Sequence, residues 1–209
     1  MQVDKLNELI QSLITYLNEN AGSSSWTAYF LPLFSTVLGA IIALIPVFLT
    51  IRRDKNDRKA SEIKRQLHDF YNPLLFLLRK DTAFYNIFNL QAKKTAADNN
   101  MEYRTLVFLV TGQHNSKNFS ETDKFLLQEI LSINEQIVQL ISKNMGNIDE
   151  DISQSLVELC RHYELLRLAE QGKIADSSEY KQYVYPRDID AKVERKVEEL
   201  YKKLNALKY

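Results

Sequence analysis

Residues that form tight turns are scarce in this chain, which has 5 Gly and 4 Pro among its 209 residues. So few turn formers leave little room for many short strands and favour a small number of long helices. A single cysteine, Cys160, excludes an internal disulfide framework and is typical of a reducing compartment. We therefore expect an all-α protein without disulfide bonds.

An excess of charge of either sign is also absent, since 27 Lys and Arg residues balance 27 Asp and Glu residues. A balanced composition gives no overall attraction to nucleic acid, so we expect no DNA or RNA duplex as a partner. The signatures GxxxxGK[ST], GxGxxG, GxSxG and HExxH are missing. Cys160 and His162 point to different sides of a helix and cannot share a metal without outside ligands. We expect no metal, no other cofactor and no enzymatic activity.

Charged side chains are missing from Ala21 to Ile51, and residues 26–51 are apolar apart from a few hydroxyl groups. At about 1.5 Å per residue, some 25 helical residues span roughly 38 Å, which is enough to cross a bilayer with some tilt. A soluble protein would have to bury such a helix on all sides, and the rest of the chain is too small to do so. A cleaved signal peptide is disfavoured because the leader is acidic and the apolar run is too long. We predict a transmembrane helix over residues 26–51.

The residues that flank this segment predict its orientation. Cations crowd its C-terminal side, whereas Lys5 is the only cation before it, and the positive-inside rule therefore places the C-terminal domain in the cytoplasm. Aromatic residues of the type found at membrane interfaces stand at the other end. The predicted membrane-flanking residues are Trp26, Tyr29, Arg52, Arg53 and Lys55.

Three segments remain besides the predicted membrane helix. Residues 1–25 are expected to form an amphipathic extracytoplasmic helix and a hinge, because apolar residues recur there at alternating steps of three and four. That helix could lie on the outer leaflet or pair with copies of itself, and pairing would require an oligomer held together elsewhere as well. Residues 52–72 predict a charged helical stalk, which Pro73 should bend or restart. Residues 73–209 predict a cytosolic helical bundle.

Within residues 73–209 the hydrophobic periodicity changes several times. The segment KKTAADNN (residues 93–100) is interpreted as a loop, and residues 102–111 are compatible with a helix or a strand, of which we favour the helix. Ser120 is expected to cap a helix that starts at the next residue, with Asp123 three residues further on. Two further amphipathic helices are expected to end the chain.

A group of basic, polar and aromatic residues is the candidate ligand-binding site. Guanidinium groups and tyrosine rings can bind a phosphorylated base through charge-assisted hydrogen bonds and stacking. The alternative is that these residues are solvated charges and tyrosines at the edge of the core. The candidates are Arg79, Lys80, His114, Lys117, Arg161, His162, Arg167, Tyr185 and Arg187.

The segment LHDFYNPLLFLL (residues 67–78), which follows the membrane helix and stalk, resembles small bacterial single-pass membrane proteins with an FYxPL segment at the start of a helical cytosolic domain. RHYELLRLAEQGKI and YPRDID fit the same likeness. More weakly, the layout is similar to membrane effectors of bacterial antiphage systems, including the type III CRISPR effector that binds cyclic tetra-adenylate. The likeness is architectural and implies no site residues.

These resemblances imply a bacterial inner membrane protein, and the cations after residue 51 place its N-terminus outside. Our hypothesis is an oligomeric sensor–effector that binds a small anionic signal, such as a cyclic oligonucleotide, and perturbs the membrane. The alternative is a membrane tether or scaffold whose helical domain docks a protein partner.

Overall fold

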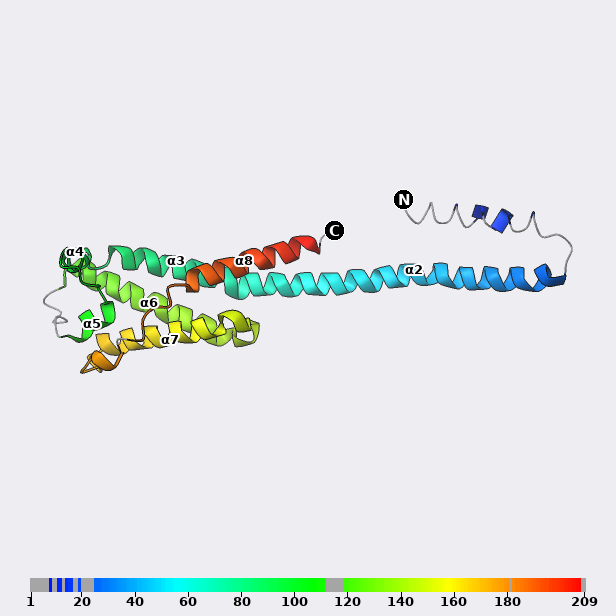
Figure 1. Ribbon diagram of the computed structural model, residues 1–209. Coiled ribbons are helices and arrows are strands. Elements are labelled where there is room, and N and C mark those ends of the chain that lie inside the picture. Colours follow the sequence, from blue (N-terminus) through cyan, green and yellow to red (C-terminus); the bar gives the residue numbers. More distant parts are fainter. Residues whose placement is uncertain are drawn as a thin grey trace. The chain divides into compact units, whose positions relative to one another are not determined.

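The computed structural model describes residues 25–111, 119–180 and 182–207, together with residues 8, 11, 12, 14–16 and 19. None of these residues forms a strand, which confirms the all-α class. The amphipathic helix predicted within residues 1–25 lies mostly outside the described residues. The chain divides into two compact units, Met1–Arg58 and Lys59–Tyr209 (Figure 1).

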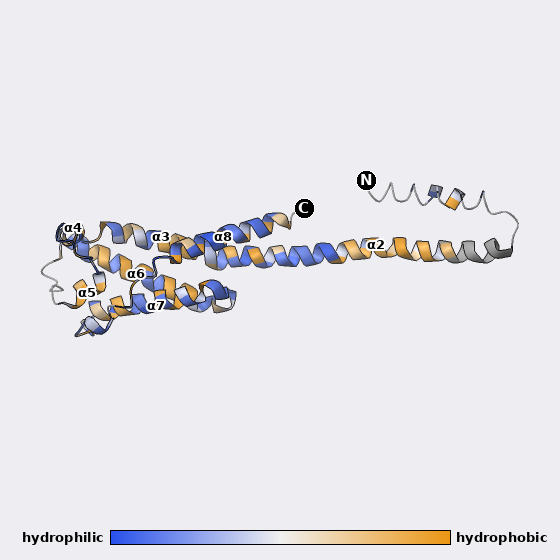
Figure 2. Ribbon diagram, viewed as in Figure 1, coloured by the Kyte–Doolittle hydropathy of each residue, from blue (hydrophilic) through white to orange (hydrophobic). Residues whose placement is uncertain are grey.

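Helix α2 extends from Ser25 to Gln66 without interruption. Figure 2 shows an apolar stretch that gives way to a hydrophilic one within this single helix. The apolar stretch is exposed, as Ile41 and Leu44 illustrate, and an 18-residue window of it is long and apolar enough to cross a membrane. An unburied apolar helix of this length is suited to lipid rather than water.

The residues predicted to flank the membrane all lie in α2. Arg52, Arg53 and Lys55 follow the apolar stretch and are exposed. Trp26 and Tyr29 lie near the start of the helix, and their side chains are outside the described part of the structure. The helix continues past Ile51, as the sequence predicts.

Pro73 changes the helical geometry of the turn before it and does not interrupt the run of helix. Proline has no N–H to donate, and its ring crowds the carbonyl group four residues earlier. Here the turn η1 (Leu67–Tyr71) adopts a π-helical form, in which the Asn72 N–H donates to the Leu67 carbonyl oxygen. Helix α3 (Asn72–Ile87) then begins with Pro73 in its first turn. Because Leu67 and Tyr71 are buried, the end of the predicted stalk forms part of the core.

The second unit is organised around four helices that share one hydrophobic core. Helix α3 contacts α6 (Glu121–Lys143) and α8 (Ile189–Ala206), and both α6 and α8 contact α7 (Glu150–Glu170) (Figure 1). Each helix contributes fully buried side chains, among them Leu74, Ile133, Leu159 and Val193. These residues belong to stripes at helical spacing, so the periodicity of each helix determines which face is buried.

Two segments between α3 and α6 contain short helices. Residues 93–100 were predicted to be a loop, and this prediction is wrong because α4 covers Leu90–Asp98. Gln, Ala and Lys favour helix there, and the Asn100 backbone, at φ 54°, ends it. In the second segment, α5 (Thr105–Val110) is helical as predicted but shorter, and it packs on α7.

The start of α6 confirms the predicted cap. The Asp123 N–H donates to Ser120 Oγ across 3.0 Å, and the Ser120 backbone is extended. This contact satisfies one of the N–H groups that a helix start leaves unpaired. Two single turns complete the described elements, η2 (Met145–Asn147) and η3 (Ser178–Tyr180).

Candidate functional site

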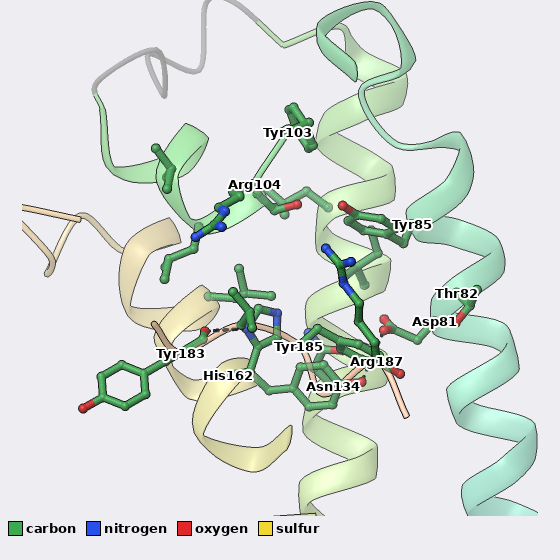
Figure 3. A pocket seen from close by; sticks show the side chains of 18 of the residues that line it. Asp81, Thr82, Tyr85, Tyr103, Arg104, Asn134, His162, Tyr183, Tyr185 and Arg187 are labelled. Atoms are coloured by element: carbon green, nitrogen blue, oxygen red, sulfur yellow. Dashed lines mark hydrogen bonds between the residues drawn. The ribbon is translucent and has the colours of Figure 1, made fainter. Parts of the chain in front are cut away.

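A cavity of about 450 Å³ opens in the second unit, and Figure 3 shows the side chains around it. Its walls come from α3, the segment 102–107, α6, α7 and the segment 180–190. The volume lies in the range of small-molecule sites, roughly 300–1,000 Å³. Several elements that are distant in sequence therefore converge on one concave surface.

Aromatic side chains form much of the wall. The rings of Tyr163 and Tyr185 have their centroids 6.3 Å apart, and the His162 and Tyr185 rings meet edge to face at 5.9 Å. Such rings offer apolar faces with polar tips, which suits a planar ligand. The six tyrosines that line the cavity are Tyr85, Tyr103, Tyr163, Tyr180, Tyr183 and Tyr185.

A buried carboxyl group, Asp81, is part of the cavity lining and is only 6% exposed. Asp81 Oδ2 accepts a hydrogen bond from the Tyr163 hydroxyl at 3.3 Å. With the Asn134 carboxamide oriented so that its nitrogen faces α3, that nitrogen donates to Asp81 Oδ1 at 3.0 Å. Burial raises the pKa of Asp81 to about 7, and the nearby Asp190 carboxylate acts in the same direction.

A second carboxyl group lies beside the first. Asp190, in the first turn of α8, accepts a hydrogen bond from the Tyr185 hydroxyl at 3.2 Å. Burial, followed by the charges of Asp190 and Asp81, raises the pKa of Tyr185. The Tyr185 hydroxyl therefore stays protonated at neutral pH and acts as a donor toward Asp190.

Two guanidinium groups stand at the rim of the cavity and share one carboxylate. Arg104 and Arg187 each approach Glu102 to 2.7 Å. The hydrogen bond from Arg104 lowers the pKa of Glu102. Because the Arg187 side chain is 85% exposed, this rim is solvated, unlike the interior.

His162 is partly buried in the wall on α7. Its Nδ1 lies 3.1 Å from the Tyr183 carbonyl oxygen, an acceptor, so Nδ1 carries the proton. Burial lowers the pKa of His162, which keeps the ring neutral at pH 7. His162 therefore positions the 183–185 segment and adds no positive charge to the cavity.

Among the residues proposed from sequence, the structure brings His162, Tyr185 and Arg187 to the cavity. Arg161 lies next to it, with its guanidinium 4.9 Å from the Tyr183 ring centre. His114 lies outside the described residues, as does Lys117.

The other three candidates have local partners elsewhere. Arg79 pairs with Glu194 at 2.7 Å, and Arg167 pairs with Glu164 at 2.6 Å on its own helix. Lys80 lies over the Phe84 ring. These three residues do not line the cavity.

Sequence reasoning missed the innermost polar residues of the cavity, Asp81, Asn134 and Asp190, which we call its floor. Asn134 directly follows Ile133 and stands four residues after Ile130 and three before Ile137, so a carboxamide interrupts an apolar stripe. A polar residue on a buried face requires hydrogen-bond partners. The position of Asn134 within an apolar stripe could therefore have pointed to a buried polar site. Asp81 gives a similar signal because it lies three residues after Leu78.

Among the described residues, no group of three or more His, Cys, Asp or Glu side chains is placed to hold a metal ion. Comparison with models of protein families, with curated proteins and with solved structures found no match to this chain.

Proposed function

We propose that this protein is a membrane-anchored, oligomeric sensor–effector of bacterial antiphage defence. Its helical domain binds a small phosphorylated ligand in the cavity, such as one unit of a cyclic oligonucleotide, and the bound state perturbs the membrane. The observation that carries this proposal is the combination of a tyrosine-lined cavity with the paired guanidinium groups of Arg104 and Arg187 at its rim.

The two ends of the cavity suit different parts of such a ligand. Tyrosine rings can stack on a base, and stacking on an aromatic side chain contributes about 1–3 kcal/mol per base. A phosphate group at the rim can compete with the Glu102 carboxylate for Arg104 and Arg187, since guanidinium groups bind phosphate through paired, charge-assisted hydrogen bonds. The cavity would hold one base with its sugar, and the rest of a larger cyclic molecule would stay outside.

The helical path offers a route from ligand to membrane. Asp81, Thr82 and Tyr85 line the cavity from α3, and α3 continues through η1 into α2 without an intervening loop. A ligand that prefers one position of α3 would bias the position of the helix in the bilayer. The π turn is a form of helix often associated with functional sites and is a natural place for such an adjustment.

The cations after the apolar stretch support the topology of the proposal. Arg52, Arg53 and Lys55 would lie on the cytoplasmic side of the inner membrane, with the N-terminus outside. A single span cannot enclose a pore by itself, so perturbation of the bilayer would require several copies.

The test uses the full chain in lipid nanodiscs and isothermal titration with purine and pyrimidine mononucleotides and with cyclic oligonucleotides. Arg187→Ala should weaken binding by about tenfold or more, because it removes a charge-assisted contact. Arg79→Ala is the matched control, since Arg79 is also exposed and pairs with a glutamate outside the cavity. Absence of binding by every nucleotide would contradict the proposal.

The membrane step requires a separate measurement. The active ligand should release a dye from vesicles that contain the full chain, and Arg187→Ala should shift this release to higher ligand concentrations. Ligand binding without release of the dye would show that the protein binds the signal but does not perturb the membrane.

A second candidate function is a membrane tether that docks a protein partner. The observation that favours it is a set of apolar side chains on the surface of the helical domain, including Phe76 and Phe125, which are 67% and 57% exposed. Here Phe76→Ser with Phe125→Ser would abolish recovery of the protein partner with the full chain from detergent-solubilised membranes, whereas Arg187→Ala would leave it intact.

A further inference from the structure

The innermost polar groups of the cavity have spare acceptors and few spare donors. The Tyr163 hydroxyl uses its proton on Asp81 Oδ2. Both N–H groups of the Asn134 carboxamide are used, one on Asp81 Oδ1 and one on the Ile130 carbonyl oxygen at 3.1 Å. An ionised carboxylate has about four lone-pair positions. Asp81 therefore keeps acceptor capacity on both oxygens after these two contacts.

The negative charge of this floor has no cationic partner in the described part of the chain. Asp81 and Asp190 belong to none of the ion pairs found there, and the two guanidinium groups at the rim are paired with Glu102. The raised pKa of Asp81 has the same origin, because burial opposes its ionisation and no cation offsets it. A ligand that brings N–H donors to Asp81 would supply the missing partner.

The shape of the site determines which arrangement of N–H donors a ligand must carry to bind Asp81. The tyrosine-lined wall favours a flat ring, and the two oxygens of one carboxylate can accept from two neighbouring N–H groups in the ring plane. Guanine presents such a pair, N1–H beside the N2 amino group. Adenine and cytosine each present an acceptor beside their amino group, and uracil has one N–H between two carbonyl oxygens. With these three bases, the ionised Asp81 carboxylate, the form that predominates above about pH 7, would face an unfavourable acceptor.

We propose that the cavity selects a guanine base, which enters with N1–H and the N2 amino group toward the Asp81 carboxylate and leaves its phosphate at Arg104 and Arg187. This assignment rests on the proposed nucleotide-binding function and names the base that the site takes. Asn134 and Tyr163 act as positioning residues, because their hydrogen bonds hold the carboxylate in place from α6 and α7.

The test compares guanosine, inosine and adenosine 5′-monophosphates by titration of the full chain in nanodiscs. Guanosine monophosphate should bind best. Inosine monophosphate lacks the N2 amino group and should bind about tenfold more weakly, and adenosine monophosphate more weakly still. Asp81→Asn should lower the affinity for the guanine nucleotide by at least about tenfold and reduce its advantage over adenine, because a carboxamide can donate to adenine N1. Glu194→Gln, on an exposed part of α8, should change neither affinity.

The outcomes separate this assignment from the general function. Equal binding of the guanine and adenine nucleotides, with no change in Asp81→Asn, would overturn the guanine assignment and leave nucleotide sensing in place. Binding of no nucleotide would overturn both. Binding of an amine such as spermidine in place of nucleotides would also overturn both, because the acidic floor would then serve a cation. Circular dichroism must show that Asp81→Asn keeps the wild-type helix content.

Discussion

The hydroxyl group of Tyr71 lies 3.1 Å from Asp149 Oδ2 and connects the π turn after α2 to the start of α7. The same hydroxyl oxygen accepts a hydrogen bond from the Asp149 N–H at 3.3 Å. Lys196 of α8 pairs with Asp149 Oδ2 at 2.6 Å, so three elements meet at one aspartate. This contact holds the turn that follows α2 to the core of the helical domain.

Tyr71→Phe should lower the free energy of unfolding by about 1–2 kcal/mol, because the partly buried Asp149 N–H and carboxylate lose their partner while the ring stays packed. Urea denaturation in detergent, followed by circular dichroism, measures the change. Tyr201→Phe is the control, since the Tyr201 hydroxyl makes an exposed contact with Asn72 and its loss should change stability by less than about 0.5 kcal/mol. Equal effects of the two substitutions would show that the Asp149 contact is not stabilising.

The core can be tested with two residues that are close together on α7. Leu159 is fully buried, whereas Val157 is 54% exposed. Leu159→Ala removes packed methyl groups and leaves a cavity, so the free energy of unfolding should fall by about 2–5 kcal/mol. Val157→Ala should change it by less than about 0.5 kcal/mol. A loss for Val157→Ala as large as that for Leu159→Ala would mean that this face of α7 is covered in solution, for example by another copy.

The helices and their buried faces were largely predictable, because apolar residues at helical spacing mark them locally. Ile133 and Ile137 on α6 and Leu156 and Leu159 on α7 are all buried as their spacing indicates. The Ser120 cap was also predictable, since its contact spans three residues. Short-range physical preferences determine each of these features.

The cavity was not predictable in the same way. Asp81 and Tyr163, which touch in the structure, are 82 positions apart, and Glu102 and Arg187 are 85 positions apart. Periodicity tells which face of a helix is buried but not which face of another helix it meets. Sequence reasoning therefore grouped exposed cations such as Arg79 with the site and overlooked the buried carboxyl group of Asp81.

The membrane assignment can be tested by placing charge in the apolar stretch of α2. Val37 and Ile41 are one turn apart and exposed. Replacing both with Arg should make insertion less favourable by about 5–7 kcal/mol, since each arginine costs about 2.5–3.5 kcal/mol near the middle of a span. Membrane fractions extracted with alkaline carbonate should then lose the protein.

The matched control for that experiment places two arginines in the hydrophilic stretch of the same helix, at Asn56 and Ser61. These positions follow the apolar stretch on the side where cations favour cytoplasmic orientation, so the protein should stay in the membrane fraction. If the double variant in the apolar stretch also stayed there, α2 would not be the element that anchors the chain.

Asp81 should make stability depend on pH in a direction that follows from its surroundings. Burial raises its pKa from 3.8 to about 7, so between these values the native state holds a proton that the unfolded chain releases. The free energy of unfolding therefore falls as pH rises through this window, and the full cost is present above about pH 7. The groups that face Asp81 are Asn134, Tyr163 and Asp190, and burial raises the pKa of Tyr163, so its hydroxyl stays protonated throughout.

Asp81→Asn removes this cost and should make the ligand-free protein more stable than wild type at about pH 8, by an amount on the order of a few kcal/mol. The difference should shrink toward about pH 4.5, where the wild-type carboxyl group is protonated in the folded state. Thermal unfolding across this pH range measures it, with Glu194→Gln as a variant expected to follow wild type. A variant that is less stable than wild type at pH 8 would show that Asp81 is held as a favourable charge. A residue that destabilises the empty domain and strengthens ligand binding is expected where a site keeps a buried charge for its ligand.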